Sequence, residues 1–98
     1  MPGPSLRIDK LLFYLRLAKS RTLAQGWAEA GHIRINGVRV EKGSFAVHSG
    51  DVITLPKGDA VLAVKLLELP SRRGPPSEAQ ACYQNLRIEN VSQEARSD

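Results

Sequence analysis

Hydrophobic residues in the first third of the chain recur at spacings of three and four, which places their side chains on one face of a helix. The first run predicts a helix over residues 9–18, because Asp9 suits the positive end of the helix dipole. Ser20 is a good N-cap for a second helix over residues 21–30. Gly31 tolerates a left-handed backbone and is expected to end that helix.

After the second helix the hydrophobic period changes to two, which is typical of strands. Ile33 and Ile35 alternate with polar neighbours, and Asn36-Gly37 favours a tight hairpin turn into residues 38–40 because both residues tolerate positive φ. Further strands are expected over residues 51–55 and 61–67. The predicted fold class is α+β, with two packed N-terminal helices followed by a small antiparallel sheet.

The composition changes at Pro70 to a stretch rich in Ser, Arg, Gly and Pro, which is typical of a linker. Ser77 is expected to cap a short helix over residues 78–86, and residues 89–98 are expected to be frayed or disordered. The sequence therefore predicts one domain over residues 1–69 with its core at 7–55. Residues 70–98 would form a linker and a short helical or disordered tail.

The positive charge is concentrated in the front half of the chain. The 98 residues carry a formal net charge of +4, but residues 7–42 hold eight basic side chains and three acidic ones. From Val61 onward, five basic residues meet five acidic ones. A field localised in this way favours a polyanion as partner.

Several classes of protein are disfavoured. Cys82 is the single cysteine, so no intramolecular disulfide can form, and a reducing compartment is the simpler assumption. The N-terminus does not resemble a secretory signal, and no apolar run approaches the roughly 18 residues that span a bilayer. No metal-ligand spacing, Ser-His-Asp pattern or phosphate loop occurs. We expect a cytoplasmic, monomeric, non-catalytic protein without cofactor, metal site or membrane contact.

The helix junction is the best candidate for binding phosphate, because free N–H groups at a helix start attract anions. Lys19 and Arg21 flank Ser20 there. Arginine binds phosphate oxygens in pairs, so Arg16 and Arg21 are the candidates for oriented contacts. The complete predicted RNA-binding set is Arg7, Asp9, Lys10, Arg16, Lys19, Ser20, Arg21, Gln25, His32, Arg34, Asn36 and Lys42.

A structural reading of the same residues stays open. Asp9 would then pair with Arg7 or Arg21 only to hold the fold, and the other charges would be solvated. Phe13 and Trp27 recur at helical spacing and favour core packing over base stacking, whereas Tyr14 fits either role.

Several short motifs occur in a fixed order between residues 7 and 55: Arg7-Ile8-Asp9-Lys10, Ala18-Lys19-Ser20-Arg21, Ala24, Gly31, Asn36-Gly37 and Gly50-Asp51-Val52-Ile53. Together they resemble the RNA-binding domain named after ribosomal small-subunit protein four. The later segment Arg72-Arg73-Gly74-Pro75-Pro76-Ser77-Glu78-Ala79, with Tyr83 beyond it, is similar to the heat-shock protein fifteen family.

Members of that second family are small proteins that bind large ribosomal subunits left carrying a peptidyl-tRNA. The resemblance implies structured RNA as partner, namely large-subunit ribosomal RNA and peptidyl-tRNA, in rescue or recycling of stalled subunits. The chain departs from the family at Gln25 and His32, where basic residues are common, and in its short C-terminal tail.

Two functions from other classes remain as alternatives. A helix-turn-helix DNA reader would use residues 21–30 as recognition helix, but Gln25 and Glu29 are the main side chains offered to base edges. A protein-interaction module would use its charge only for solubility, and its binding would not depend on salt. Roughly four to six phosphate contacts would instead give a log-log salt slope of about −3 to −5.

Overall fold

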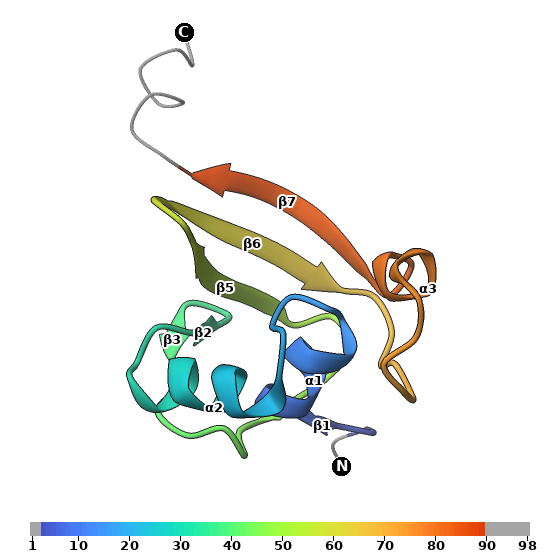
Figure 1. Cartoon of the computed structure of the whole chain (residues 1–98), viewed down its shortest axis with the longest axis horizontal. Coiled ribbons are helices and arrows are strands. Elements are labelled where there is room, and N and C mark those ends of the chain that lie inside the picture. Colours follow the sequence, from blue (N-terminus) through green and yellow to red (C-terminus); the bar gives the residue numbers. More distant parts are fainter. Residues whose placement is uncertain (1–2, 90–98) are drawn as a thin grey trace, which may run out of the picture.

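The computed structural model describes residues 3–89. Helix α1 (Ile8–Tyr14) and helix α2 (Arg21–Glu29) pack against each other below one face of a curved sheet (Figure 1). The α+β class predicted from the sequence is confirmed. Within the described residues, no helix is long and apolar enough to cross a bilayer.

The first helix ends four residues earlier than predicted, at Tyr14 instead of residue 18. Arg16 adopts a left-handed backbone with φ of 63°, and its N–H donates to the carbonyl of Phe13. The N–H of Leu17 donates to the carbonyl of Leu12, which completes a helix-ending turn that normally contains glycine. Because arginine rarely takes this conformation, no stop signal is visible in the sequence.

The second helix follows its sequence signals. The Ser20 hydroxyl accepts a hydrogen bond from the N–H of Leu23 at 3.0 Å, as expected of an N-cap. Gly31, at φ of 80°, follows the C-cap residue Ala30 and ends the helix. The predicted cap and stop are both confirmed.

The main sheet has five antiparallel strands in the order β3-β2-β5-β6-β7. Its strands are β2 (Arg34–Ile35), β3 (Val38–Arg39), β5 (Val52–Lys57), β6 (Ala60–Leu66) and β7 (Tyr83–Glu89). Strands β1 (Leu6–Arg7) and β4 (Ala46–Val47) form a separate two-stranded sheet beside α1. Asn36 (φ 53°) and Gly37 (φ 85°) form the hairpin turn between β2 and β3, as predicted.

The C-terminal segment differs from its prediction. Helix α3 (Pro76–Gln80) follows Pro75, so Ser77 is not its cap, and the helix stops six residues before the expected end at residue 86. The next residues form strand β7, which pairs with β6 from Leu66↔Tyr83 to Val61↔Glu89. This pairing depends on β6, so it leaves little local signal. The disorder expected after Glu89 lies outside the described residues.

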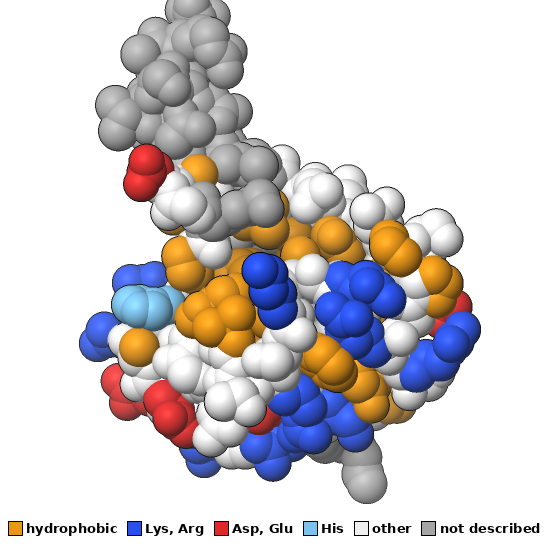
Figure 2. Space-filling model, in the orientation of Figure 1, with side chains coloured by type: hydrophobic (Ala, Val, Ile, Leu, Met, Phe, Trp, Pro, Cys, Tyr) orange, Lys and Arg blue, Asp and Glu red, His pale blue; other side chains and the backbone are white. Residues whose placement is uncertain are grey.

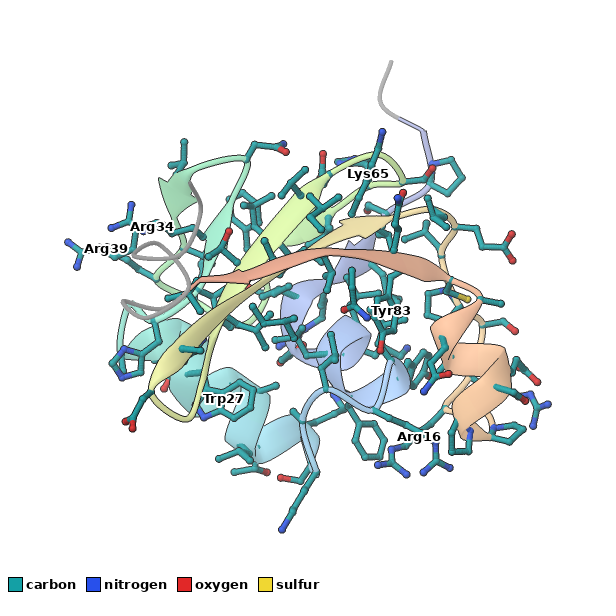
Figure 3. All side chains as sticks on the ribbon, turned by 90° about the horizontal axis from the view of Figure 1, so that it is seen from above. Arg16, Trp27, Arg34, Arg39, Lys65 and Tyr83 are labelled. Atoms are coloured by element: carbon teal, nitrogen blue, oxygen red, sulfur yellow. The ribbon has the colours of Figure 1, made fainter. Side chains whose placement is uncertain are left out.

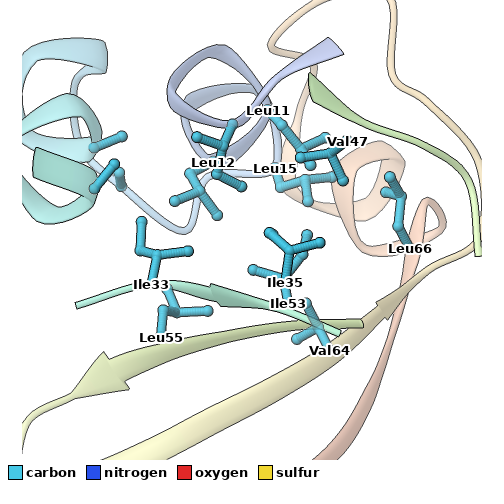
Figure 4. Packing of buried hydrophobic residues seen from close by; sticks show 14 of the residues in the cluster. Leu11, Leu12, Leu15, Ile33, Ile35, Val47, Ile53, Leu55, Val64 and Leu66 are labelled. Carbon is cyan, nitrogen blue, oxygen red and sulfur yellow. The ribbon is translucent and has the colours of Figure 1, made fainter. Parts of the chain in front are cut away.

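The hydrophobic core lies between the helices and the inner face of the sheet (Figure 4). Helix α1 contributes Leu11 and Leu12, its C-cap residue is Leu15, and each of the three is at most 1% exposed. The sheet contributes Ile35, Ile53, Leu55, Leu62, Val64 and Leu66, and Ile33 precedes β2; all seven are buried. Alternate residues of β6 point to the other face, where Lys65 is exposed.

The segment beyond residue 69 packs onto this body. The N–H of Leu67 donates to the carbonyl of Cys82 at 2.7 Å, and Ala79 and Cys82 are buried. Burial is the main reason that the pKa of the Cys82 thiol is raised, with smaller contributions from the charges of Glu68 and Glu78. The predicted boundary at residue 70 stays a prediction about which part can fold alone.

Candidate nucleic-acid interface

Asp9 is the centre of the charged groups at the helix junction. Its side chain is 2% exposed and accepts hydrogen bonds from Arg7 Nε at 3.1 Å and Arg7 Nη2 at 2.9 Å. It also accepts the N–H of Lys10 at 2.6 Å, and Arg21 Nη2 lies 3.7 Å away. The hydrogen bond and the charge of Asp9 raise the pKa of Arg7. One buried carboxylate therefore orients two half-exposed arginines.

The loop that carries Lys42 lies against the start of α1. The N–H of Asp9 donates to the carbonyl of Gly43 at 3.2 Å, and the N–H of Ile8 donates to Phe45 at 2.8 Å. Gly43 is buried, and a methyl group placed on it would approach Asp9 and Gln25. The fold thus brings together residues distant in sequence. We call Arg7, Asp9, Lys19, Ser20, Arg21, Gln25 and Lys42 the junction cluster.

Some members of the junction cluster already have partners inside the protein. The Ser20 hydroxyl caps α2, and Gln25 Nε2 donates to Glu29 Oε2 at 2.9 Å. Lys19 and Lys42 are exposed. The arrangement satisfies the structural interpretation and leaves the RNA-binding interpretation as a prediction, because Asp9 holds the two arginines while about half of each arginine side chain stays exposed.

A second group of charges lies on the β2–β3 hairpin. Arg34 and Arg39 are directly opposite in the strand register and project from the same end of the molecule (Figure 3). Arg34 Nη1 donates to the carbonyl of Gly37 at 3.3 Å, and Arg39 Nε lies 3.9 Å from Glu41 Oε2. Like charges directly opposite each other destabilise a sheet, and a bound anion would relieve the repulsion.

The neighbouring predicted residues have different surroundings. The Asn36 amide donates to Asp51 Oδ1 at 3.1 Å, and its oxygen accepts the N–H of Val52 at 2.9 Å. This side chain therefore fastens the hairpin turn to β5. His32 is exposed just after α2. Trp27 is half-buried and packs against the core, as its spacing predicted.

The end of α1 carries charges that the sequence did not associate. Arg16 Nε donates to the carbonyl of Gly74 at 2.6 Å, and Arg73 Nε donates to the carbonyl of Phe13 at 3.1 Å. The Arg73 guanidinium lies 4.6 Å from the Phe13 ring centre, and Lys10 Nζ lies 5.5 Å from that of Tyr14. Arg73 was absent from the predicted set because its segment was interpreted as a linker.

Basic side chains gather on the part of the surface over α1 and toward α3 (Figure 2). Among residues 3–89 no group of His, Cys, Asp and Glu side chains is arranged to hold a metal ion. The fold and these positive groups define a small α+β domain suited to nucleic acid.

Comparisons with known proteins specify the class. The family model described as the S4 domain matches residues 6–53. Heat shock protein 15 homolog from Aeromonas salmonicida is 33% identical over 89 residues, covering 86% of this chain and 67% of that protein. RQC P-site tRNA stabilizing factor from Listeria innocua is 38% identical over 65 residues, covering 66% of this chain and 70% of that factor.

Other relatives are longer or have solved structures. The chain spans only 39% of the length of small ribosomal subunit protein uS4 from Gloeobacter violaceus, with 34% identity covering 82% of this chain. The trimeric structure of Vibrio cholerae heat shock protein 15 has a TM-score of 0.79 and 29% identity, covering 95% of this chain and 89% of that one.

The chain belongs to the S4-domain family and resembles heat shock protein 15 over most of its length. It is therefore a non-catalytic RNA-binding protein, in agreement with the sequence prediction. Membership of this family also disfavours the DNA-reading alternative. The expected monomer stays a prediction for this chain.

Proposed function

We propose that this protein binds ribosomal RNA of the large subunit and acts in the rescue or recycling of large subunits that have stalled with a peptidyl-tRNA. The observation that carries the proposal is the junction cluster, in which buried Asp9 holds Arg7 and Arg21 toward solvent. Fixed guanidinium groups suit the phosphates of a folded RNA. This role would place the protein in the cytoplasm, with the ribosome.

The relatives support both parts of the proposal. Heat shock protein 15 is similar to this chain in sequence and in structure. The Listeria factor is described as stabilising P-site tRNA. This is the binding activity expected of a protein that recognises a subunit with tRNA still bound. The wider RNA-binding surface of the proposal includes Lys10, Arg16, His32, Arg34 and Asn36 besides the junction cluster.

Sedimentation through a sucrose gradient tests the role directly. The purified chain is mixed in low salt with small subunits, large subunits, intact ribosomes, or large subunits carrying peptidyl-tRNA. We expect selective co-migration with the last of these. Absence of the chain from every ribosomal fraction would overturn the ribosomal role, and equal binding to all fractions would remove its specificity.

Arg21→Ala tests the site in the same assay. Loss of one charge-assisted contact should weaken binding by about 1 to 3 kcal/mol, with the fold intact. Lys65→Ala is the matched control, because it removes one positive charge from the opposite face of β6 and should bind like the wild type. Equal affinities of the two variants would exclude Arg21 from the site.

Oligomeric state enters the design of this experiment, because a trimer would present three junction clusters. Sedimentation equilibrium of the free chain distinguishes a particle of 10.7 kDa from one three times as heavy.

A further inference from the structure

Two arginines at the end of α1 fix each other's chain segments. Arg16 reaches the carbonyl of Gly74, and Arg73, the residue before Gly74, reaches back to the carbonyl of Phe13. The Phe13 ring supports the Arg73 guanidinium from below at 4.6 Å. This reciprocal pair joins segments that are almost 60 residues apart in sequence. Both guanidinium groups are therefore held in defined positions.

The pair differs in its charge balance from the arginines that face a carboxylate, namely Arg7, Arg21, Arg39 and Arg72. Arg7 is paired with Asp9, Arg39 with Glu41, and the neighbouring Arg72 with Glu78 at 2.7 Å. Among the ion pairs of residues 3–89, none includes Arg16 or Arg73. Glu78, one of the two carboxylates nearest to Arg73 in sequence, is already engaged by Arg72. Two positive charges are thus anchored at the end of α1 without an ion-pair partner in the described part of the chain.

The hydrogen-bonding capacity of the pair points outward. A guanidinium has five N–H donors, and in each arginine only the Nε–H is used by a backbone carbonyl. The Nη groups retain the parallel N–H bonds that suit two oxygens of one phosphate. Figure 3 shows the Arg16 side chain leaving the body of the molecule near α3. Arg16 is exposed, and Arg73 is partly buried.

The backbone of Arg16 is strained to reach this position. A non-glycine residue at φ of 63° is strained, and glycine at the same place would end the helix without that strain. Strain of this kind persists where surrounding structure fixes it, and here the Gly74 carbonyl does so.

We propose that Arg16 and Arg73 form a two-arginine clamp for a phosphate of the RNA backbone. The S4-domain match ends at residue 53, so Arg73 would extend the RNA footprint onto the C-terminal segment and α3. This inference rests on RNA binding by the family and not on the rescue role. It assigns the segment before α3 a direct function in binding.

The test uses the full chain and purified large-subunit ribosomal RNA as probe, with affinities measured over a series of salt concentrations. Arg73→Gln should weaken binding roughly tenfold and lower the magnitude of the salt slope by about 1. Arg72→Gln is the matched control. It removes the same charge at the neighbouring position, but Arg72 is already paired with Glu78, so this substitution should change affinity less than twofold.

Two more variants separate clamping from charge and from folding. Arg73→Lys keeps the charge but loses the fork, so affinity should fall about fivefold while the thermal unfolding midpoint stays near that of the wild type. Arg16→Gln combined with Arg73→Gln should weaken binding by less than the product of the single effects, because both groups hold one phosphate.

Equal affinities of Arg73→Gln and Arg72→Gln would overturn the clamp, as would wild-type affinity of Arg73→Lys. A wild-type chain that ignores ribosomal subunits but binds this RNA, with Arg73→Gln tenfold weaker, would overturn the proposed ribosomal role and support the clamp.

Discussion

Gly43 limits the space around the carboxylate of Asp9. A methyl group at Gly43 would lie 2.9 Å from Asp9 Oδ2, 3.2 Å from Asp9 Cβ and 3.1 Å from Gln25 Cγ. Because Asp9 is buried and fixed by Arg7, it cannot move away freely. We expect Gly43→Ala to lower the free energy of unfolding by about 1 to 3 kcal/mol, as overpacking does. Urea denaturation measures the change.

RNA affinity gives a second readout of the same substitution. Displacing Asp9 would disturb Arg7 and Arg21 together, so Gly43→Ala should weaken RNA binding even under conditions where the chain is fully folded. Gly26→Ala is the control, because Gly26 is exposed in the middle of α2 with open space around it. It should raise stability by about 0.5 to 1 kcal/mol and leave affinity unchanged. A neutral Gly43→Ala would show that the junction cluster tolerates rearrangement.

The sequence predicted residues whose roles are local and missed those set by distant contacts. Ser20 as cap and Gly31 as helix stop follow from the chemistry of single residues. The helix end at Arg16 could not be predicted from such local rules, because its left-handed backbone is stabilised by Gly74, a residue 58 positions away. Arg73 belonged to a family-like motif, but its position could not be predicted, since nothing near it in sequence indicates that it lies on Phe13.

Among the structural elements, the β2–β3 hairpin shows how a predicted binding residue serves the fold. The sequence analysis included Asn36 in the RNA-binding set, and its side chain makes two hydrogen bonds that hold the turn against Asp51 and Val52. Asn36→Ala should lower the free energy of unfolding by about 1 to 3 kcal/mol, because it loses both bonds and keeps the left-handed φ. Asn36→Gly should cost about 1 kcal/mol less, because glycine adopts that backbone freely.

The glycine variant also separates folding from binding at this turn. If Asn36 acts only through the hairpin, Asn36→Gly binds large-subunit ribosomal RNA as the wild type does at temperatures well below its unfolding midpoint. A severalfold loss of affinity in the folded variant would instead support direct contact between the Asn36 side chain and RNA.

Strand β7 is the element that the sequence did not predict. Residues 78–86 favoured a helix, and α3 accounts for only the first part of that stretch. From Tyr83 the backbone pairs with β6 as far as Glu89, with one register shift between Val64↔Asn85 and Ala63↔Arg87, and that pairing outweighs the local preference. The hairpin turn at Asn36-Gly37 was predictable because two adjacent residues determine it. The pairing of β6 with β7 was not predictable, because 16 residues separate the two strands.

At the scale of the whole molecule, the C-terminal segment and the S4-domain core behave in the structure as one packed body. Strand β7 covers the edge of β6, the carbonyl of Cys82 accepts a hydrogen bond from the N–H of Leu67, and Ala79 of α3 is buried. A chain that ends after residue 69 would lose all three. Burial of a few side chains contributes several kcal/mol, a large part of the 5 to 15 kcal/mol that usually stabilises a domain.

We therefore expect a chain of residues 1–69 to unfold with a free energy roughly 3 to 5 kcal/mol below that of the full chain, measured by urea denaturation of both. Its RNA affinity should fall further than its folded fraction explains, because the partner of Arg16 in the clamp is removed with the segment. Equal unfolding midpoints would instead establish residues 1–69 as an independent domain, as the sequence predicted. The C-terminal segment would then act in binding alone, and Arg73→Gln in the full chain would reproduce most of the loss of affinity caused by truncation.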